Sequence, residues 1–223
     1  MIEWIFPRFC VSCDAPLLPS EKEGACLKCL LELPKTDFWF FPCANEGYYR
    51  LAPHAPNLRG VVCGFWYGVG SPLRRWIQAA KYEGQPRLLY AAARHMAALS
   101  ERYLPLSEIQ GILPIPISAL RWRKRGYNQA EWAARGFSEG WNIPLLSRHW
   151  VRRPSSGSQL GRKQTARWIE LEGEFRCVRP LPSVVAVVDD VLTTGATLAA
   201  ALRSLPASTA AWVLTVGITQ RRR

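Results

Sequence analysis

The sequence has no long hydrophobic run. Nowhere do apolar residues approach the roughly 18 in succession that a membrane-spanning helix needs. Residues 1–6 (MIEWIF) include an acidic side chain and lack the basic and extended apolar regions of an export signal. These absences predict a cytoplasmic protein without a membrane span. Acidic residues are also scarce, with 17 Asp and Glu against 29 Lys and Arg, and the net charge of +12 predicts an anionic partner.

Cysteine is present in a pattern typical of a metal site. Two C-x2-C pairs separated by twelve residues comprise Cys10, Cys13, Cys26 and Cys29. Four thiolates form the closed tetrahedral site of a structural Zn²⁺, which leaves no open position for catalysis. Disulfides are the alternative, but they require an oxidising compartment, so we predict one structural Zn²⁺. The pattern leaves open whether Cys43 and His54 contribute to metal binding, and we interpret Cys63 and Cys177 as core residues.

The length allows one core of ordinary size and a small metal-stabilised unit, because 48% of the 223 residues are apolar. A stretch containing Pro and Asn at residues 51–60 precedes a strand-like run at residues 61–67. We therefore predict a zinc-binding domain over residues 1–55 and an α/β domain over residues 56–223. The first is too small to build a sufficient core, so bound metal is expected to supply much of its folding free energy.

The strongest functional signal lies near the carboxyl terminus. Residues 184–188 are apolar on both faces and β-branched at four of five positions, as expected of a buried parallel strand. Asp189 and Asp190 follow at the sheet edge where open α/β folds bind ligands. Buried carboxylates there need partners, and ribose hydroxyls or a divalent cation are suitable.

A loop suited to phosphate comes directly afterwards. It comprises Thr193, Thr194, Gly195, Ala196 and Thr197, and it precedes a helical apolar stripe over residues 198–205. Backbone N–H groups at such a helix start can surround a phosphate, so we infer a phosphorylated sugar as ligand. The alternative is that the two aspartates cap a turn and the loop is an ordinary helix N-cap.

The middle of the chain has the alternation of a doubly wound sheet. Apolar stripes predict helices over residues 73–81, 89–96 and 130–137, and Asn128 or Gly126 is placed to help start the last one. Short buried strands are predicted at residues 111–117 and 210–218, the first interrupted by prolines. The fold class predicted is α/β, with a parallel sheet flanked by helices.

Several motifs together resemble a known family. Residues 185–197 (VAVVDDVLTTGAT) resemble the phosphoribosyl-pyrophosphate (PRPP) motif of type I phosphoribosyltransferases. Five further motifs precede it: the four cysteines, KYEG at 81–84, PIP before a basic run, RGYNQ at 125–129 and QL at 159–160. Their order is similar to that in the ComF/GntX family, the competence-associated phosphoribosyltransferase-like proteins. The resemblance spans almost the whole chain and implies a type I phosphoribosyltransferase-like sheet with a small N-terminal zinc-ribbon or knuckle domain.

The resemblance also implies roles for particular residues. Asp189 and Asp190 would hold the ribose with Mg²⁺ nearby, residues 193–197 the 5′-phosphate, and Lys81 and Arg125 the pyrophosphate side. For Lys81 the alternative is a solvated lysine at a helix end. A possible mobile loop would contain Gln159, Arg162 and Arg167. The implied reaction displaces pyrophosphate from PRPP in favour of an acceptor that the sequence does not identify.

A different class of function fits the basic composition. The chain would then be a single-stranded-DNA-binding or DNA-uptake factor that uses PRPP as a regulatory ligand and interacts with other competence proteins. Ten tryptophans are present, and most are expected in the core. Trp122 lies between Arg121 and Arg123, so it is the strongest candidate for a base-stacking platform.

Overall fold

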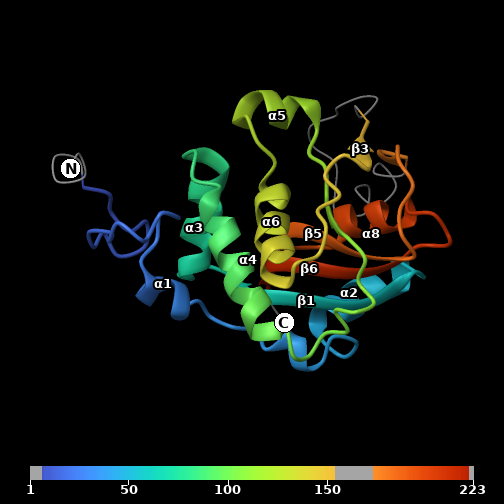
Figure 1. The fold of residues 1–223 in the computed structure, drawn as a ribbon, viewed down its shortest axis with the longest axis horizontal. Helices are drawn as coiled ribbons and strands as arrows, with labels where there is room; N and C mark the ends of the chain where they lie inside the picture. Colours follow the sequence, from blue (N-terminus) through green and yellow to red (C-terminus); the bar gives the residue numbers. More distant parts are fainter. Residues whose placement is uncertain (1–6, 154–172, 221–223) are drawn as a thin grey trace.

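The computed structural model describes residues 7–153 and 173–220 and has an α/β architecture (Figure 1). A four-stranded parallel sheet has the order β1-β6-β5-β2, and a two-stranded antiparallel pair joins β3 to β4. The sheet strands are β1 (Leu58–Tyr67), β2 (Ile112–Pro114), β5 (Val184–Leu192) and β6 (Ala210–Thr219), and the pair is β3 (Trp150–Arg152) with β4 (Phe175–Cys177). The longer helices are α3 (Pro72–Tyr82), α4 (Arg87–Ser100), α5 (Ala119–Arg125), α6 (Gln129–Trp141) and α8 (Ala196–Arg203), and the shorter ones are α1 (Leu27–Leu31), η1 (Phe38–Phe40), α2 (Glu46–Leu51) and η2 (Ala52–His54).

Helices cover both faces of the parallel sheet. The apolar stripes of α3, α4 and α6 pack in one cluster with Val62, Val188 and Leu214. On the opposite face, α8 packs with Val187 and Val213. Burial on both faces explains why β5 and β6 are almost continuously apolar, as expected for parallel strands between helical layers. The predicted α/β class with a parallel sheet is therefore confirmed.

The strand that carries the two aspartates is longer than predicted. β5 pairs with β6 from Val184 opposite Ala210 as far as Leu192 opposite Ile218. Asp189 and Asp190 thus lie within the strand, near its carboxyl end, rather than directly after it. Pairing with the ten-residue strand β6 extends the ladder past the acidic step. The sheet consequently fixes the backbone of both carboxylates.

The other predicted elements are present with altered ends. Helices α3, α4 and α6 contain the predicted stripes, and the Asn128 side chain accepts the N–H of Ala130 at the start of α6. The predicted strand at residues 111–117 contracts to β2, because the prolines at its end lack the N–H that a ladder needs. Helix α8 ends at Arg203, before the last residue of its predicted stripe.

Helix α5 is an element that the apolar pattern did not predict. It comprises ALRWRKR and has no buried residue, and Figure 1 shows it standing away from the sheet beyond α6. Ser118 caps its first turn by accepting the N–H of Arg121, and Gly126 ends it in the left-handed conformation with φ 78°. Local capping, rather than packing, defines this helix.

The N-terminal segment contributes side chains to the hydrophobic clusters on both faces of the sheet. Cys10, Cys29 and Trp39 belong to the cluster that contains α3 and α4, whereas Leu51 and Ala55 belong to the cluster under α8. A separate zinc-binding domain over residues 1–55 therefore stays a prediction. Among the described residues, no helix combines the length and apolar character needed to cross a membrane.

Candidate functional site

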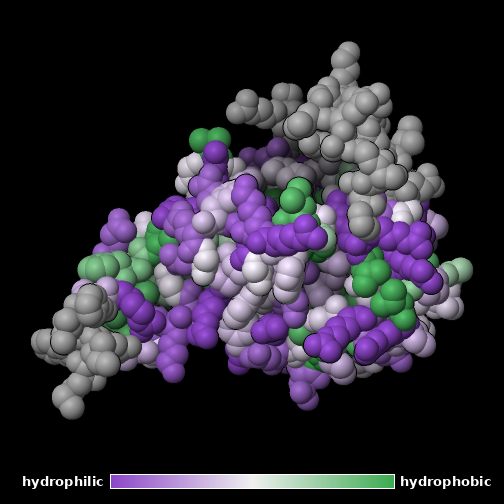
Figure 2. Space-filling view, turned by 90° about the horizontal axis from the view of Figure 1, so that it is seen from above, coloured by the Kyte–Doolittle hydropathy of each residue, from purple (hydrophilic) through white to green (hydrophobic). Residues whose placement is uncertain are grey.

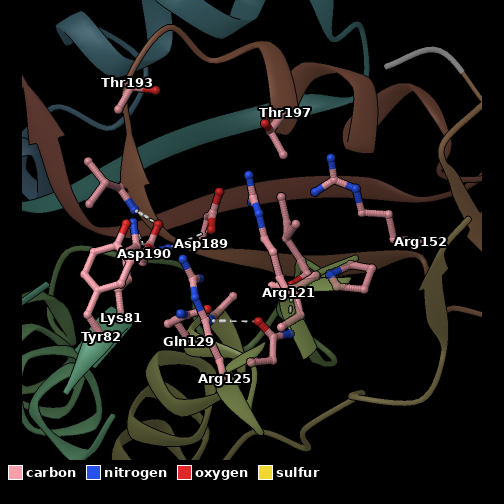
Figure 3. A pocket seen from close by; sticks show the side chains of 16 residues that line it. Lys81, Tyr82, Arg121, Arg125, Gln129, Arg152, Asp189, Asp190, Thr193 and Thr197 are labelled. Atoms are coloured by element: carbon pink, nitrogen blue, oxygen red, sulfur yellow. Dashed lines mark hydrogen bonds and ion pairs between the residues drawn. The ribbon is translucent and has the colours of Figure 1, made fainter. Parts of the chain in front are cut away.

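A cavity of about 280 Å³ opens at the carboxyl edge of the sheet. Elements from four parts of the chain meet there: the end of α3, the segment from β2 to the start of α6, β3, and the end of β5 with the loop after it (Figure 3). The charged and hydroxylated residues that line it are Lys81, Tyr82, Arg121, Arg125, Arg152, Asp189, Asp190, Thr193 and Thr197. Two carboxylates and four cations thus share one concave surface, which suits a ligand with both hydroxyl and anionic groups.

The acidic pair is held by the backbone and by one lysine. The N–H of Asp190 donates to Asp189 Oδ1 at 2.8 Å, and the N–H of Val191 donates to Asp190 Oδ1 at 2.8 Å. Lys81 Nζ lies 2.6 Å from Asp190 Oδ2. Burial and the neighbouring charge of Asp190 raise the pKa of Asp189 to about 7. A bound hydroxyl group or cation would therefore favour the ionised form of Asp189.

The ion pair assigns Lys81 to the cavity rather than to a solvated helix end. Burial opposes the charge of Lys81, but attraction to Asp190 and Asp189 outweighs it and raises the pKa of the lysine. The hydroxyl of Tyr127 donates to the carbonyl of Ala80 at 2.7 Å, which ties the RGYNQ segment to the last turn of α3. The structure thus brings Lys81 and the RGYNQ segment together at the same cavity.

The loop at residues 193–197 forms the start of α8. Thr193 and Thr197 line the cavity, whereas Gly195 and Ala196 are buried beneath it. Gly195 is the N-cap, with φ 89°, and offers no capping side chain, whereas the Thr194 hydroxyl accepts the N–H of Ala196 at 3.4 Å. A Cβ at this position would lie 2.9 Å from Leu51 Cδ2, so both the backbone angle and the packing require glycine. Uncapped N–H groups at a helix start are suited to binding an anion.

The basic side of the cavity comes from α5 and β3. The Arg125 guanidinium lies over the Tyr82 ring, 5.6 Å from its centroid. Arg152 forms an ion pair with Glu174 at 2.7 Å. Arg121 and Arg152 were missed as site residues, because nothing in the sequence distinguishes them from the other members of their basic runs.

The start of α6 supplies a second polar end to the cavity. Asn128 is buried, and its Nδ2 donates to the carbonyl of Ile115 at 2.9 Å. Gln129 is 3% exposed and lines the cavity, and its buried Nε2 has no hydrogen-bond partner in the described structure. A buried donor without a partner is costly in free energy, so Gln129 is suited to meeting a ligand oxygen. Two helix starts, those of α6 and α8, therefore face one cavity.

The four predicted cysteine ligands converge at a separate place. Their sulfur atoms lie within 4.8 Å of one another, and Cys13 Sγ and Cys26 Sγ are 3.8 Å apart. A tetrahedral Zn²⁺ with Zn–S bonds of about 2.3 Å requires sulfur separations of about 3.8 Å. The N–H of Cys26 also donates to Cys10 Sγ at 3.4 Å, which stabilises a thiolate. The residues present fit one structural Zn²⁺.

The remaining predicted residues have separate outcomes. Within the described residues, the metal-ligand cluster contains neither Cys43 nor His54. The Cys43 thiol is exposed and donates to the carbonyl of Arg59. Cys63 is a core residue, and burial raises the pKa of its thiol to about 12. The proposed mobile-loop residues lie outside the described residues: Gln159, Arg162 and Arg167.

Fold and site together define an α/β protein with a cavity at the sheet edge and an N-terminal cluster of four cysteines that could hold a metal ion. No family model matches the sequence. The chain is 29% identical over 208 residues to Competence protein F of Haemophilus influenzae, an alignment that covers 85% of this chain and 86% of that protein. This similarity, together with the order of the motifs, supports membership of the ComF family.

Proposed function

We propose that the protein binds PRPP and acts as a phosphoribosyltransferase, displacing pyrophosphate in favour of an acceptor still to be identified. The observation that carries the proposal is the cavity itself, in which an acidic pair lies between two helix starts and four cations. A pentose with phosphate groups at both ends carries the complementary chemistry. Neutral metabolites would offer no anionic group to Arg121 and Arg125, whereas Arg152 already forms an ion pair with Glu174.

The ligand is expected to lie across the sheet edge. Residues 193–197 would receive the 5′-phosphate, and the carboxylates of Asp189 and Asp190 would accept hydrogen bonds from the ribose hydroxyls. The pyrophosphate would face Lys81, Arg125 and the start of α6, where Gln129 Nε2 has no hydrogen-bond partner among residues 7–153 and 173–220. Each ligand group then meets a protein group of complementary chemistry, and the partly buried carboxyl of Asp189 gains hydrogen bonds besides the one from the N–H of Asp190.

Catalysis in this arrangement rests on positioning and electrostatics. The bond between the anomeric carbon and the pyrophosphate oxygen breaks, the bond to the acceptor forms, and pyrophosphate leaves. The two carboxylates would stabilise positive charge developing on the ribose ring, while the arginines would stabilise the departing anion. Mg²⁺ bound with PRPP would neutralise part of the pyrophosphate charge, and the carboxylate oxygens of Asp189 and Asp190 are suitable ligands for it.

Thermal unfolding with ligand tests the proposal. PRPP with Mg²⁺ at about 100 times its Kd should stabilise the fold by about 2.7 kcal/mol, which is roughly 5–10 °C for a chain of this size. The Asp190→Ala variant should show no such shift, whereas Glu108→Ala, which changes an exposed carboxylate, should respond like the wild type. A wild-type protein that melts at the same temperature with and without PRPP would refute the assignment. Radiolabelled PRPP with candidate acceptors then tests turnover.

One observation favours a second function, binding of single-stranded DNA. Trp122 is 50% exposed, whereas five of the other described tryptophans are buried: Trp39, Trp76, Trp141, Trp150 and Trp212. Trp122 lies on α5 among basic residues, and the surface seen from the side of α5 is largely hydrophilic with small, separate apolar patches (Figure 2). The name of the Haemophilus influenzae relative supports a competence-associated role with DNA or other competence proteins as partners. The cysteine thiolates fit a cytoplasmic location, where thiols stay reduced.

The two functions give different binding results. If α5 is a stacking platform, Trp122→Ala should weaken salt-dependent binding of an oligothymidylate by about tenfold and leave PRPP binding unchanged. A variant at a buried position, Trp212→Phe, is the matched control. Oligonucleotide affinity that is equal in wild type and Trp122→Ala would exclude this role for α5.

A further inference from the structure

Arg50 is a buried arginine of α2 that lies beneath the loop at residues 193–197. Its side chain is 2% exposed, and it is not among the residues that line the cavity. Its Nη1 donates to the carbonyl of Thr193 at 2.6 Å and to Thr219 Oγ1 at 3.2 Å. Its Nη2 donates to the carbonyl of Thr219 and to Glu46. One guanidinium thus joins α2, the end of β6 and the first residue of the loop.

The contact with Thr193 matters because of the loop's orientation. A peptide chain that turns its N–H groups toward a phosphate must direct carbonyl oxygens elsewhere, and a carbonyl facing the anion would repel it. Arg50 binds the carbonyl of Thr193 from a position outside the cavity lining. Because Glu46 balances the charge of the guanidinium, the hydrogen bond to Thr193 is its main contribution to the loop, in surroundings from which water is largely excluded.

A second contact from the same helix supports the loop. Leu51 packs against Gly195, where an added Cβ would lie 2.9 Å from Leu51 Cδ2. The start of α2 is itself fixed, because Asn45 Nδ2 donates to the carbonyl of Val61 at 2.8 Å and Asn45 Oδ1 accepts the N–H of Tyr48. Consecutive side chains of α2 therefore contact both the first residue and the glycine of the loop, from a segment anchored to β1.

We propose that Arg50 is a positioning residue for the phosphate loop: it preorganises residues 193–197 for the sugar 5′-phosphate and has no part in binding the pyrophosphate end. The inference rests on the proposed function. It makes α2, which lies in the N-terminal part of the chain, a component of the ligand site.

The test compares ligands that occupy the two ends of the cavity separately. Ribose 5-phosphate probes the loop, and inorganic pyrophosphate with Mg²⁺ probes the basic side. Arg50→Met, which keeps a long side chain but removes every donor, should raise the Kd for ribose 5-phosphate at least tenfold and change the Kd for pyrophosphate less than twofold. Arg50→Lys keeps the charge and one donor group, so this variant should fold even where Arg50→Met does not. Its Kd for ribose 5-phosphate should lie between those of the wild type and Arg50→Met, and its Kd for pyrophosphate should be unchanged.

Leu205→Ala is the matched control for a purely structural effect. Leu205 is buried in the same cluster beyond the other end of α8, so its truncation destabilises the fold without touching the loop. This variant should bind both ligands with wild-type affinity at a temperature where all variants are folded. The positioning role would be overturned if the Arg50 variants bound both ligands equally more weakly, or if their affinity for ribose 5-phosphate were unchanged. A wild-type protein that binds neither PRPP nor ribose 5-phosphate would instead overturn the proposed function.

Discussion

The partly buried carboxyl of Asp189 is expected to make the ligand-free protein less stable at neutral pH than at pH 4. Burial and the nearby charge of Asp190 raise the pKa of Asp189 from its ordinary 3.8 to about 7. The folded state therefore holds a proton that the unfolded state releases between about pH 4 and pH 7. The contribution of protonated Asp189 to the free energy of unfolding is fully present below about pH 4. It is lost as the pH rises to about 7, because the folded state must then bear a partly buried charge beside Asp190.

The magnitude follows from the same pKa values. Each pKa unit corresponds to about 1.4 kcal/mol, so the loss has an upper limit of about 4 kcal/mol. Because the cavity is open to solvent, we expect about 1–4 kcal/mol. Asp189→Asn keeps an oxygen that can accept the N–H of Asp190 but cannot ionise. The variant should be more stable than the wild type at pH 8, and the difference should shrink toward zero near pH 4.

Urea unfolding of the ligand-free protein at several pH values between 4.5 and 8 measures this difference. Glu108→Gln, at an exposed carboxylate, is the control and should differ from the wild type by the same small amount at every pH. With PRPP and Mg²⁺ the order should reverse, because only the wild type offers the carboxylate. A difference for Asp189→Asn that does not depend on pH, or a variant less stable than the wild type at pH 8, would refute the reasoning.

Three further predictions concern other parts of the chain. Cys26→Ser should lower bound zinc from one per chain to near zero by elemental analysis, and freshly purified wild type without zinc would contradict the thiolate assignment. Lys81→Met removes the ion pair with Asp190 and should weaken PRPP binding at least tenfold by calorimetry, whereas an unchanged Kd would exclude Lys81 from PRPP binding. Asn128→Ala removes the cap of α6 and the donor to the carbonyl of Ile115, so the free energy of unfolding should fall by about 1–3 kcal/mol. A loss below about 0.3 kcal/mol would contradict the capping role of Asn128.

The features that the sequence predicted are those whose causes are local. The apolar run at residues 184–188 lies in β5 because its residue types suit burial between two layers, and the glycine of the loop that follows adopts the positive φ that its residue type permits. The four cysteines meet because each C-x2-C pair already places two sulfur atoms together. In each case, the chemistry of a few neighbouring residues determines their conformation.

The contacts that the sequence did not reveal are those between distant segments. Arg50 binds Thr193 and Thr219, which lie 143 and 169 residues away, and nothing near Arg50 distinguishes it from the other basic residues. Arg152 lies at the cavity because β3 pairs with β4, a strand that begins more than twenty residues later in the chain. Only the assembled sheet selects these two arginines among the 29 basic residues of the chain.

Helix α5 shows why an apolar pattern is an incomplete guide to this site. A seven-residue helix without a buried side chain is marginal in water, so its stability depends on Ser118 at the start, Gly126 at the end and basic residues in its last turn. Those residues are visible in the sequence, but they produce no apolar stripe, and Gly126 ends α5 rather than helping to start α6. The same lack of packing keeps Arg121 and Arg125 available to the cavity, since an arginine held in the core could not reach a ligand. The element hardest to recognise by its hydrophobic pattern is thus one that supplies half of the cations of the proposed site.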